Sequence, residues 1–137
     1  MLIPRPETEL LVEEAIQWLE KNPNKRSAYD VGTGSGVIAV CLADAVPDLC
    51  ITALDISSEA LEVARGNCEH YHHEDQITFK QNNLLENISG KADLITANLP
   101  YIPTPTLAQL PALRFEPQLA LDGGADGLKF IRPLLQQ

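Results

Sequence analysis

The chain has 137 residues, 45% of them hydrophobic, which allows one globular domain with a core. Its formal net charge is −9, with 10 Lys and Arg against 19 Asp and Glu, and this balance argues against DNA or RNA as a partner, because such binding neutralises phosphates with basic side chains. No apolar run is long enough to span a membrane and the start lacks the pattern of a signal peptide, so we expect a cytoplasmic protein.

Helices and strands alternate along the first half of the chain. Pro4 and Pro6 keep the first residues extended, and a helix is expected over residues 7–19. The apolar stripe of this helix is predicted to consist of Leu10, Leu11, Ala15, Trp18 and Leu19. A short strand follows over residues 27–31, then a glycine-rich loop over 32–36 and an apolar helix over 37–45, which Pro47 ends.

The second half continues the alternation and then changes character. A strand over residues 50–54 ends in Asp55, and Ser57 or Ser58 is expected to cap a helix that runs to about residue 69. Strands are predicted over 77–80 and 92–97. Residues 99–126 form a long connection with five prolines, and a last helix is predicted from near Asp126, kinked or shortened by Pro133.

This order predicts an α/β fold, a parallel sheet with helices on both faces. Ligands bind such sheets at the carboxyl ends of the strands. The glycine loop, Asp55, the Asn82-Asn83 turn and the segment from Asn98 to Tyr101 all follow strands. We therefore expect these segments to line one crevice.

The segment from Asp30 to Gly36 has the pattern of a ligand-binding loop, since glycines let a backbone turn sharply and pass close to a ligand. An ordinary tight turn would look the same. Asp55 is placed to accept hydrogen bonds from two ribose hydroxyls, and its alternative role is to cap the following helix. Because the Gly-x-Gly-x-Gly spacing departs from the dinucleotide fingerprint, S-adenosylmethionine is favoured over a nicotinamide cofactor, with Asp30 near its ammonium group.

Two Asn-containing turns follow the later strands. The Asn82-Asn83-Leu84 turn suits an adenine, because its polar side chains are able to hydrogen-bond the exocyclic amine while Leu84 packs on the ring. The alternative is an ordinary Asn-rich loop. Asn98 and the backbone carbonyl of Leu99 offer two acceptors, and Tyr101 offers a flat aromatic face. Such a turn is able to grip a planar NH2 group.

Four motifs in collinear order resemble the HemK/PrmC family of protein glutamine methyltransferases. They are residues 3–13, residues 30–36, residues 98–102, and residues 115–117 with 120–128. The resemblance implies a Rossmann-like class I methyltransferase fold and methyl transfer from S-adenosylmethionine to the glutamine side chain in the Gly-Gly-Gln loop of peptide-chain release factors. Ribosomal-protein glutamine methyltransferases share a similar turn, but the segment from Pro4 to Glu9 favours the release-factor branch.

By this resemblance the substrate amide would be held by Asn98, Leu99, Pro100 and Tyr101. The implied cofactor site comprises Asp30, Gly32, Thr33, Gly34, Ser35, Gly36, Asp55, Asn83, Leu84 and Asn98. Two positions depart from the family pattern, since Leu99 stands where Pro is usual and Asn83 where Asp is usual.

The family comparison also implies that residues 1–137 form a partial methyltransferase domain, without the family's N-terminal helical domain and its last strands. The predicted fourth strand would then be an exposed edge, and exposed edges pair with other chains. We therefore expect a homodimer or a domain-swapped assembly.

Other signals are weaker. His70, His72 and His73 stand beside acidic residues but show no metal-ligand spacing, so a solvated loop is favoured. Arg5 and Glu7 are expected to contact the substrate or the helix start, or to form a surface ion pair, and Glu116 to hold the long loop or cap a turn. Trp18 is expected in the core. The cysteines Cys41, Cys50 and Cys68 form no Cys-x-x-Cys pair and are expected to be reduced and mostly buried.

Two rival functions stay open at this point. The Asn98 turn would grip the exocyclic amine of adenine equally well, which points to an adenine amino-methyltransferase acting on nucleic acid. The chain could also be a cofactor-binding remnant that serves as an interaction module without catalysis.

Overall fold

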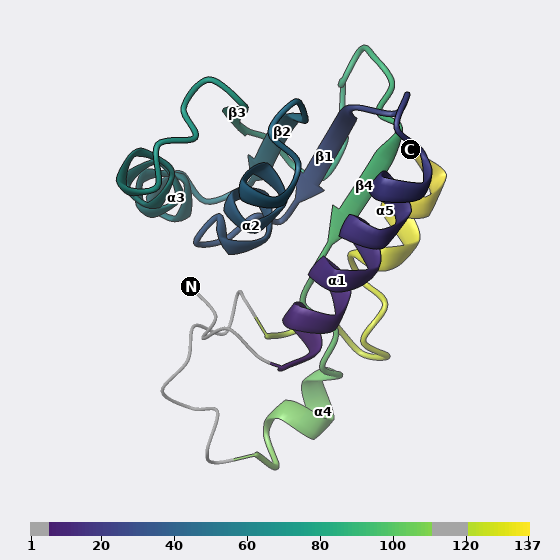
Figure 1. The fold of residues 1–137 in the computed structure, drawn as a ribbon. Helices are drawn as coiled ribbons and strands as arrows, with labels where there is room; N and C mark the ends of the chain where they lie inside the picture. Colours follow the sequence, from purple (N-terminus) through teal and green to yellow (C-terminus); the bar gives the residue numbers. More distant parts are fainter. Residues whose placement is uncertain (1–5, 111–120) are drawn as a thin grey trace.

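The computed structural model describes residues 6–110 and 121–137, and its centre is a four-stranded parallel sheet in the order β3-β2-β1-β4 (Figure 1). The strands are β1 (Ser27–Val31), β2 (Cys50–Asp55), β3 (Ile77–Gln81) and β4 (Leu94–Ala97). Val31 pairs with Leu54 of β2 and with Ala97 of β4, so the carboxyl ends of three strands lie level at one edge. The predicted α/β fold with a parallel sheet is confirmed.

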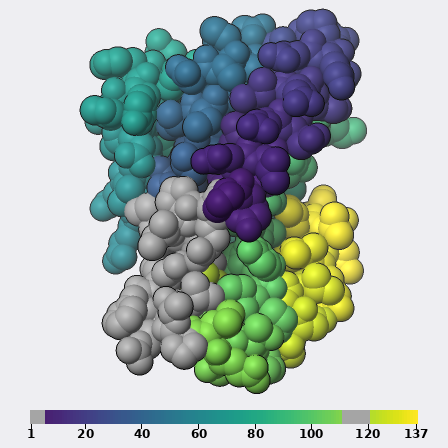
Figure 2. Space-filling view, turned by 60° about the horizontal axis from the view of Figure 1, so that its bottom comes forward, coloured from purple at the N-terminus to yellow at the C-terminus, as the bar shows by residue number. Residues whose placement is uncertain are grey.

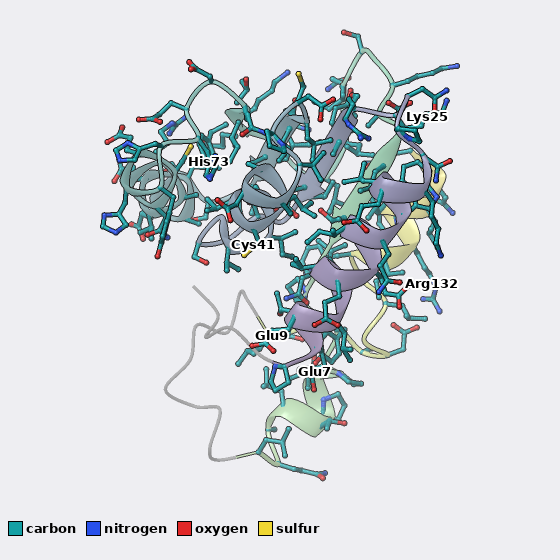
Figure 3. The ribbon with its side chains drawn as sticks, viewed as in Figure 1. Glu7, Glu9, Lys25, Cys41, His73 and Arg132 are labelled. Atoms are coloured by element: carbon teal, nitrogen blue, oxygen red, sulfur yellow. The ribbon has the colours of Figure 1, made fainter. Side chains whose placement is uncertain are left out.

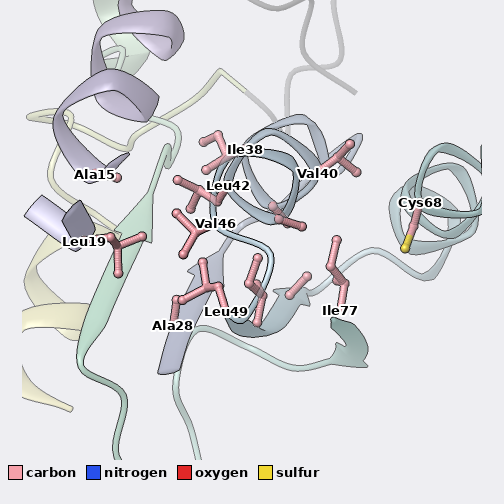
Figure 4. Close-up of a cluster of buried hydrophobic side chains, with 14 residues drawn as sticks. Ala15, Leu19, Ala28, Ile38, Val40, Leu42, Val46, Leu49, Cys68 and Ile77 are labelled. Atoms are coloured by element: carbon pink, nitrogen blue, oxygen red, sulfur yellow. The ribbon is translucent and has the colours of Figure 1, made fainter. Parts of the chain in front are cut away.

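Helices cover both faces of this sheet. One face carries α1 (Pro6–Lys21), α2 (Val37–Ala45) and α3 (Ser58–His70), and the other carries α5 (Ile131–Gln136) (Figure 1). A short α4 (Thr104–Leu107) follows β4. The larger apolar cluster lies beneath α1 and α2, where Leu19, Leu42 and Leu49 have no exposed surface (Figure 4). This packing holds α1 against the sheet.

The buried face of α1 differs from the predicted stripe. Leu10 is 62% exposed and Trp18 37% exposed, whereas Thr8 is buried together with Ala15 and Leu19. The prediction that Trp18 belongs to the core is therefore wrong. Thr8, Ala15 and Leu19 lie on one side of the helix at intervals of seven and four residues. Leu11 packs against the same core cluster, so the predicted stripe is correct at Leu11, Ala15 and Leu19 and wrong at Leu10 and Trp18.

The last helix begins later than predicted. It starts at Ile131, not near Asp126, and Pro133 is its third residue, where a missing N–H leaves no broken helical bond. The predicted long connection contains α4 and an isolated parallel bridge between Ile102 and Asp122. The chain around Asp122 therefore pairs with the segment after β4, and the helix does not begin until Ile131.

Two further expectations concern the cysteines and the membrane. Cys68 is buried, but Cys41 and Cys50 are exposed, so the expectation of mostly buried cysteines is wrong. Cys41 lies on the outer side of α2, and Cys50 is the first residue of β2. Among the described residues, no helix has both the length and the apolar character needed to cross a membrane.

Candidate functional site

The glycine loop turns back over the end of β2. Gly32, Gly34 and Gly36 all have positive φ angles, of +70°, +56° and +79°, a region that side chains with a Cβ rarely adopt. The N–H groups of Gly32 and Thr33 both donate to the carbonyl of Leu54, at 2.8 and 2.9 Å. A Cβ at Gly34 would meet no atom within 4 Å, so this part of the loop borders open space that a ligand is able to approach.

Asp30 lies beneath this loop and is 1% exposed. Its carboxylate accepts hydrogen bonds from the hydroxyls of Thr33, at 2.7 Å, and Thr96, at 2.8 Å. Burial raises its pKa to about 6, although these bonds and one from the Ala39 N–H favour the charged form. Asp30 thus ties the loop to α2 and β4, and its contact with a cofactor ammonium group stays a prediction.

Asp55 joins the glycine loop to the start of α3, and its predicted contact with ribose hydroxyls stays a prediction. One carboxylate oxygen accepts the Gly34 N–H and the other accepts the Ser57 N–H, both at 2.9 Å. Ser57 is the N-cap of α3, as its side chain accepts the Ala60 N–H at 3.2 Å. A carboxylate oxygen has two lone pairs, so each keeps one for a ligand hydroxyl.

The Asn82-Asn83-Leu84 turn joins this group because the Asn82 N–H donates to the Asp55 carbonyl at 2.9 Å. The Asn83 amide nitrogen donates to Glu86 at 3.0 Å, which leaves its amide oxygen as the acceptor for an exocyclic amine. Leu84 has a positive φ of 51°, and its side chain lies in the apolar cluster with Val31. The role of this turn at adenine stays a prediction.

The turn from Asn98 to Tyr101 lies directly against the glycine loop. Leu99 is 8% exposed, and a Cβ at Gly32 would lie only 2.9 Å from its Cδ2 atom. The Asn98 amide nitrogen donates to the Thr8 hydroxyl at 3.2 Å. Pro100 is half-buried, and Tyr101 is 51% exposed. A ligand on the loop and a group on this turn would therefore be neighbours.

A second glycine segment supports the turn, and the sequence analysis assigned it no role. The Ile102 N–H donates to the Leu121 carbonyl at 3.1 Å, and the Gly123 N–H donates back to Ile102 at 2.8 Å. A Cβ at Gly123 would lie 2.8 Å from the Tyr101 Cα, and one at Gly127 would overlap the Tyr101 carbonyl oxygen. Closely spaced glycines after a long connection are the signal that could have indicated this close approach.

Thr8 was also missed as a contact of the site. It belongs to the first turn of α1, and the start of that helix lies beside the chain that follows β4 (Figure 2). Figure 3 shows Glu7 and Glu9 at the same end of α1, and both are exposed. The predicted contacts of Glu7 stay predictions, and Arg5 and Glu116 lie outside the described residues.

A groove of about 520 Å³ lies between α2 and α3. Ser35 of the glycine loop is part of its lining, but none of the described residues at the carboxyl end of a strand is. Its lining includes Val37, Val40, Cys41, Asn67 and Tyr71. Asp44 and His73 are at its rim, with 3.5 Å between the His73 Nε2 and the Asp44 carboxylate. Within the described ranges, no three His, Cys, Asp or Glu side chains are grouped to hold a metal ion. The expectation of a solvated histidine loop fits the exposed His70 and His72, but the His73 side chain is only 13% exposed.

The comparisons with known proteins agree on a methyl-transferring class. The family described as Methyltransferase small domain matches residues 7–108. The chain is 42% identical over 137 residues to the release factor glutamine methyltransferase of Deinococcus radiodurans, covering 99% of this chain and 48% of the relative. It is 41% identical over 138 residues to the ribosomal protein uL3 glutamine methyltransferase of Bordetella pertussis, covering 98% and 46%.

Solved structures show the same architecture. The hMettl16 catalytic domain superposes with a TM-score of 0.68 at 21% identity, over 98% of this chain and 52% of that one. The S-adenosylmethionine-dependent methyltransferase SibL, in its apo form, superposes with a TM-score of 0.52 at 28% identity, over 64% and 24%.

The parallel sheet, the glycine loop at its carboxyl edge and the acid after the second strand define a Rossmann-like class I methyltransferase fold. Within that class, the chain belongs to the methyltransferase small domain family. It spans about half the length of the curated relatives that it matches.

Proposed function

We propose that this chain binds S-adenosylmethionine and transfers its methyl group to the side-chain amide nitrogen of a glutamine in a peptide-chain release factor. The observation that carries the proposal is the contact between the Asn98 turn and the glycine loop at Gly32, which makes an NH2-gripping turn the neighbour of a cofactor loop. Several relatives near 40% identity are named release factor glutamine methyltransferases.

The residues present fit the cofactor. Open space at Gly34 and the remaining lone pairs of Asp55 suit a ligand whose ribose hydroxyls need acceptors. The Asn83 amide nitrogen is bonded to Glu86, so its amide oxygen would be the end that accepts from an adenine amine. When bound, S-adenosylmethionine supplies an electrophilic methyl group on a sulfonium.

The contribution of this chain to the reaction is then to position the glutamine amide nitrogen. A glutamine amide nitrogen is a poor nucleophile because its lone pair is delocalised, so orientation is the main lever available. The Asn98 amide oxygen and the Leu99 carbonyl accept the two N–H bonds of the substrate. They also stabilise the positive charge that develops on nitrogen, and the product loses its proton to water.

A substitution at Asn98 tests this function. We expect Asn98→Ala to lower the rate of methyl transfer by about 10²–10³-fold, which is the effect of removing one hydrogen-bonding group that stabilises transition-state charge in other enzymes. Cofactor affinity should change little. Label transfer from S-adenosylmethionine to release factor measures the rate, and equilibrium dialysis measures affinity.

The control is Asn24→Ala, an exposed asparagine in the turn between α1 and β1, at the opposite edge of the sheet. It should retain full activity. Equal turnover by Asn98→Ala and wild type would contradict the proposal. Labelling of adenine-containing DNA in place of release factor would support the rival amino-methyltransferase, and cofactor binding without any label transfer would support the remnant.

The proposal extends to location and assembly. A release-factor substrate is met in the cytoplasm, and nucleic acid or a membrane is not part of the proposed reaction. β4 pairs with β1 on one side, and among the described residues no strand pairs with its other side. Ile95 in β4 is 47% exposed, so this edge suits pairing with a second copy of the chain.

A further inference from the structure

A hydrogen bond joins the start of α1 to the nitrogen end of the Asn98 amide in the candidate site. Thr8 is 8% exposed, and its hydroxyl oxygen lies 3.2 Å from the Asn98 amide nitrogen, although the two residues are 90 positions apart. An asparagine amide has a donor end and an acceptor end of nearly the same shape. With the nitrogen bonded to Thr8, the amide oxygen is the end left for a substrate.

We propose that Thr8 is a positioning residue that holds the Asn98 amide in this orientation and thereby makes the site select glutamine against glutamate. The inference rests on the proposed function, because it concerns the group that the Asn98 turn accepts. Glutamine and glutamate have nearly the same shape, so hydrogen-bond polarity and charge are what separate them.

The polarity follows from the two acceptors. The Asn98 amide oxygen and the Leu99 carbonyl match an NH2 group, which donates two hydrogen bonds. A carboxylate at the same place brings only acceptors and a negative charge, so it leaves these groups unpaired. If the Asn98 amide turned over, its N–H would face the substrate, and the site would accept a carboxylate oxygen instead.

The surroundings make Thr8 suited to this task. The helix that carries it is anchored by Ala15 and Leu19 in the core beneath α1 and α2, so the hydroxyl does not depend on a substrate for its position. The buried side chain of Leu99 anchors the backbone that carries the second acceptor. The two acceptors are therefore held by separate elements before any substrate arrives.

The test uses Thr8→Val, which keeps the shape and removes the hydroxyl, and Thr8→Ser, which restores it. The matched control is Thr78→Val, at an exposed position of β3. The substrates are a Gly-Gly-Gln peptide and its Gly-Gly-Glu counterpart, with kcat and KM measured for the first and inhibition for the second. Melting curves verify that each variant is folded.

We expect Thr8→Val to lower kcat/KM for the glutamine peptide about tenfold or more, since a site loses discrimination when its polar groups are misdirected. Inhibition by the glutamate peptide should become stronger, and cofactor affinity should stay within twofold of wild type. Thr8→Ser and Thr78→Val should resemble wild type. The proposal would be overturned if Thr8→Val lowered kcat/KM for the glutamine peptide and weakened inhibition by the glutamate peptide to the same extent. It would also be overturned if neither quantity changed.

A measurement without turnover separates this inference from the proposed function. In the labelled chain, the Asn98 side-chain NH2 protons should give strong nuclear Overhauser effects to the Thr8 methyl group, and their absence would overturn the assigned orientation. The wild-type chain could show these strong effects and bind S-adenosylmethionine but leave glutamine unmethylated. That result would support the orientation of the Asn98 amide and overturn the proposed function.

Discussion

Gly32→Ala tests the contact between the glycine loop and the Asn98 turn. Alanine at a positive φ costs about 1–2 kcal/mol, because its Cβ crowds the neighbouring carbonyl. The φ of Gly32 is +70°, and the new Cβ would also lie 2.9 Å from the Leu99 Cδ2 atom. Moving that side chain off its rotamer adds about 0.5–1.5 kcal/mol. The two terms together predict a loss of about 1.5–3.5 kcal/mol in the free energy of unfolding.

Two other glycines separate these terms. Gly34 has a φ of +56° and no atom within 4 Å of its would-be Cβ, so Gly34→Ala should show the backbone cost of about 1–2 kcal/mol alone. Gly66 lies within α3 with neither a positive φ nor a close atom, so Gly66→Ala should stabilise the protein by about 0.5–1 kcal/mol.

Urea unfolding at 25 °C measures all three variants. In a Leu99→Ala background, the cost of Gly32→Ala should fall to that of Gly34→Ala, because the close contact is gone. The reasoning is refuted if Gly32→Ala is no more destabilising than Gly34→Ala, or if its cost is unchanged in the Leu99→Ala background.

The remaining predictions concern pH and assembly. Burial raises the pKa of Asp30 to about 6 in the folded state, against an ordinary value of 3.8, so between these values the folded state binds up to one proton more than the unfolded state. The stability of wild type relative to Asp30→Asn should therefore be highest below pH 4 and fall by roughly 3 kcal/mol as the pH rises through 6. Urea unfolding from pH 4 to 7 measures this difference, and a difference that grows with pH would contradict it. For the β4 edge, light scattering should show a dimer that Ile95→Lys weakens, because a charge on an edge strand opposes pairing; a monodisperse wild-type monomer would rule out the assembly.

Much of the fold could be predicted because its signals are local. The apolar strands 27–31 and 50–54, the glycines between them and the serine cap at Ser57 each act through neighbours in the chain. α1 shows the limit of such reasoning, since its buried side includes the polar Thr8 and leaves the apolar Leu10 and Trp18 exposed. The last helix shows the same limit, because the chain before Ile131 is held by the backbone at Tyr101 and Ile102.

The sequence by itself determined the parallel α/β fold, the position of the glycine loop and the chemistry of the Asn98 turn, because residue type and spacing set these locally. Only the tertiary structure decided which way the Asn98 amide faces and what supports Tyr101. Those outcomes depend on Thr8, Gly123 and Gly127, which approach the turn from distant parts of the chain. A hydrogen bond across 90 residues leaves no pattern in the sequence, because it exists only once the sheet and α1 have packed together.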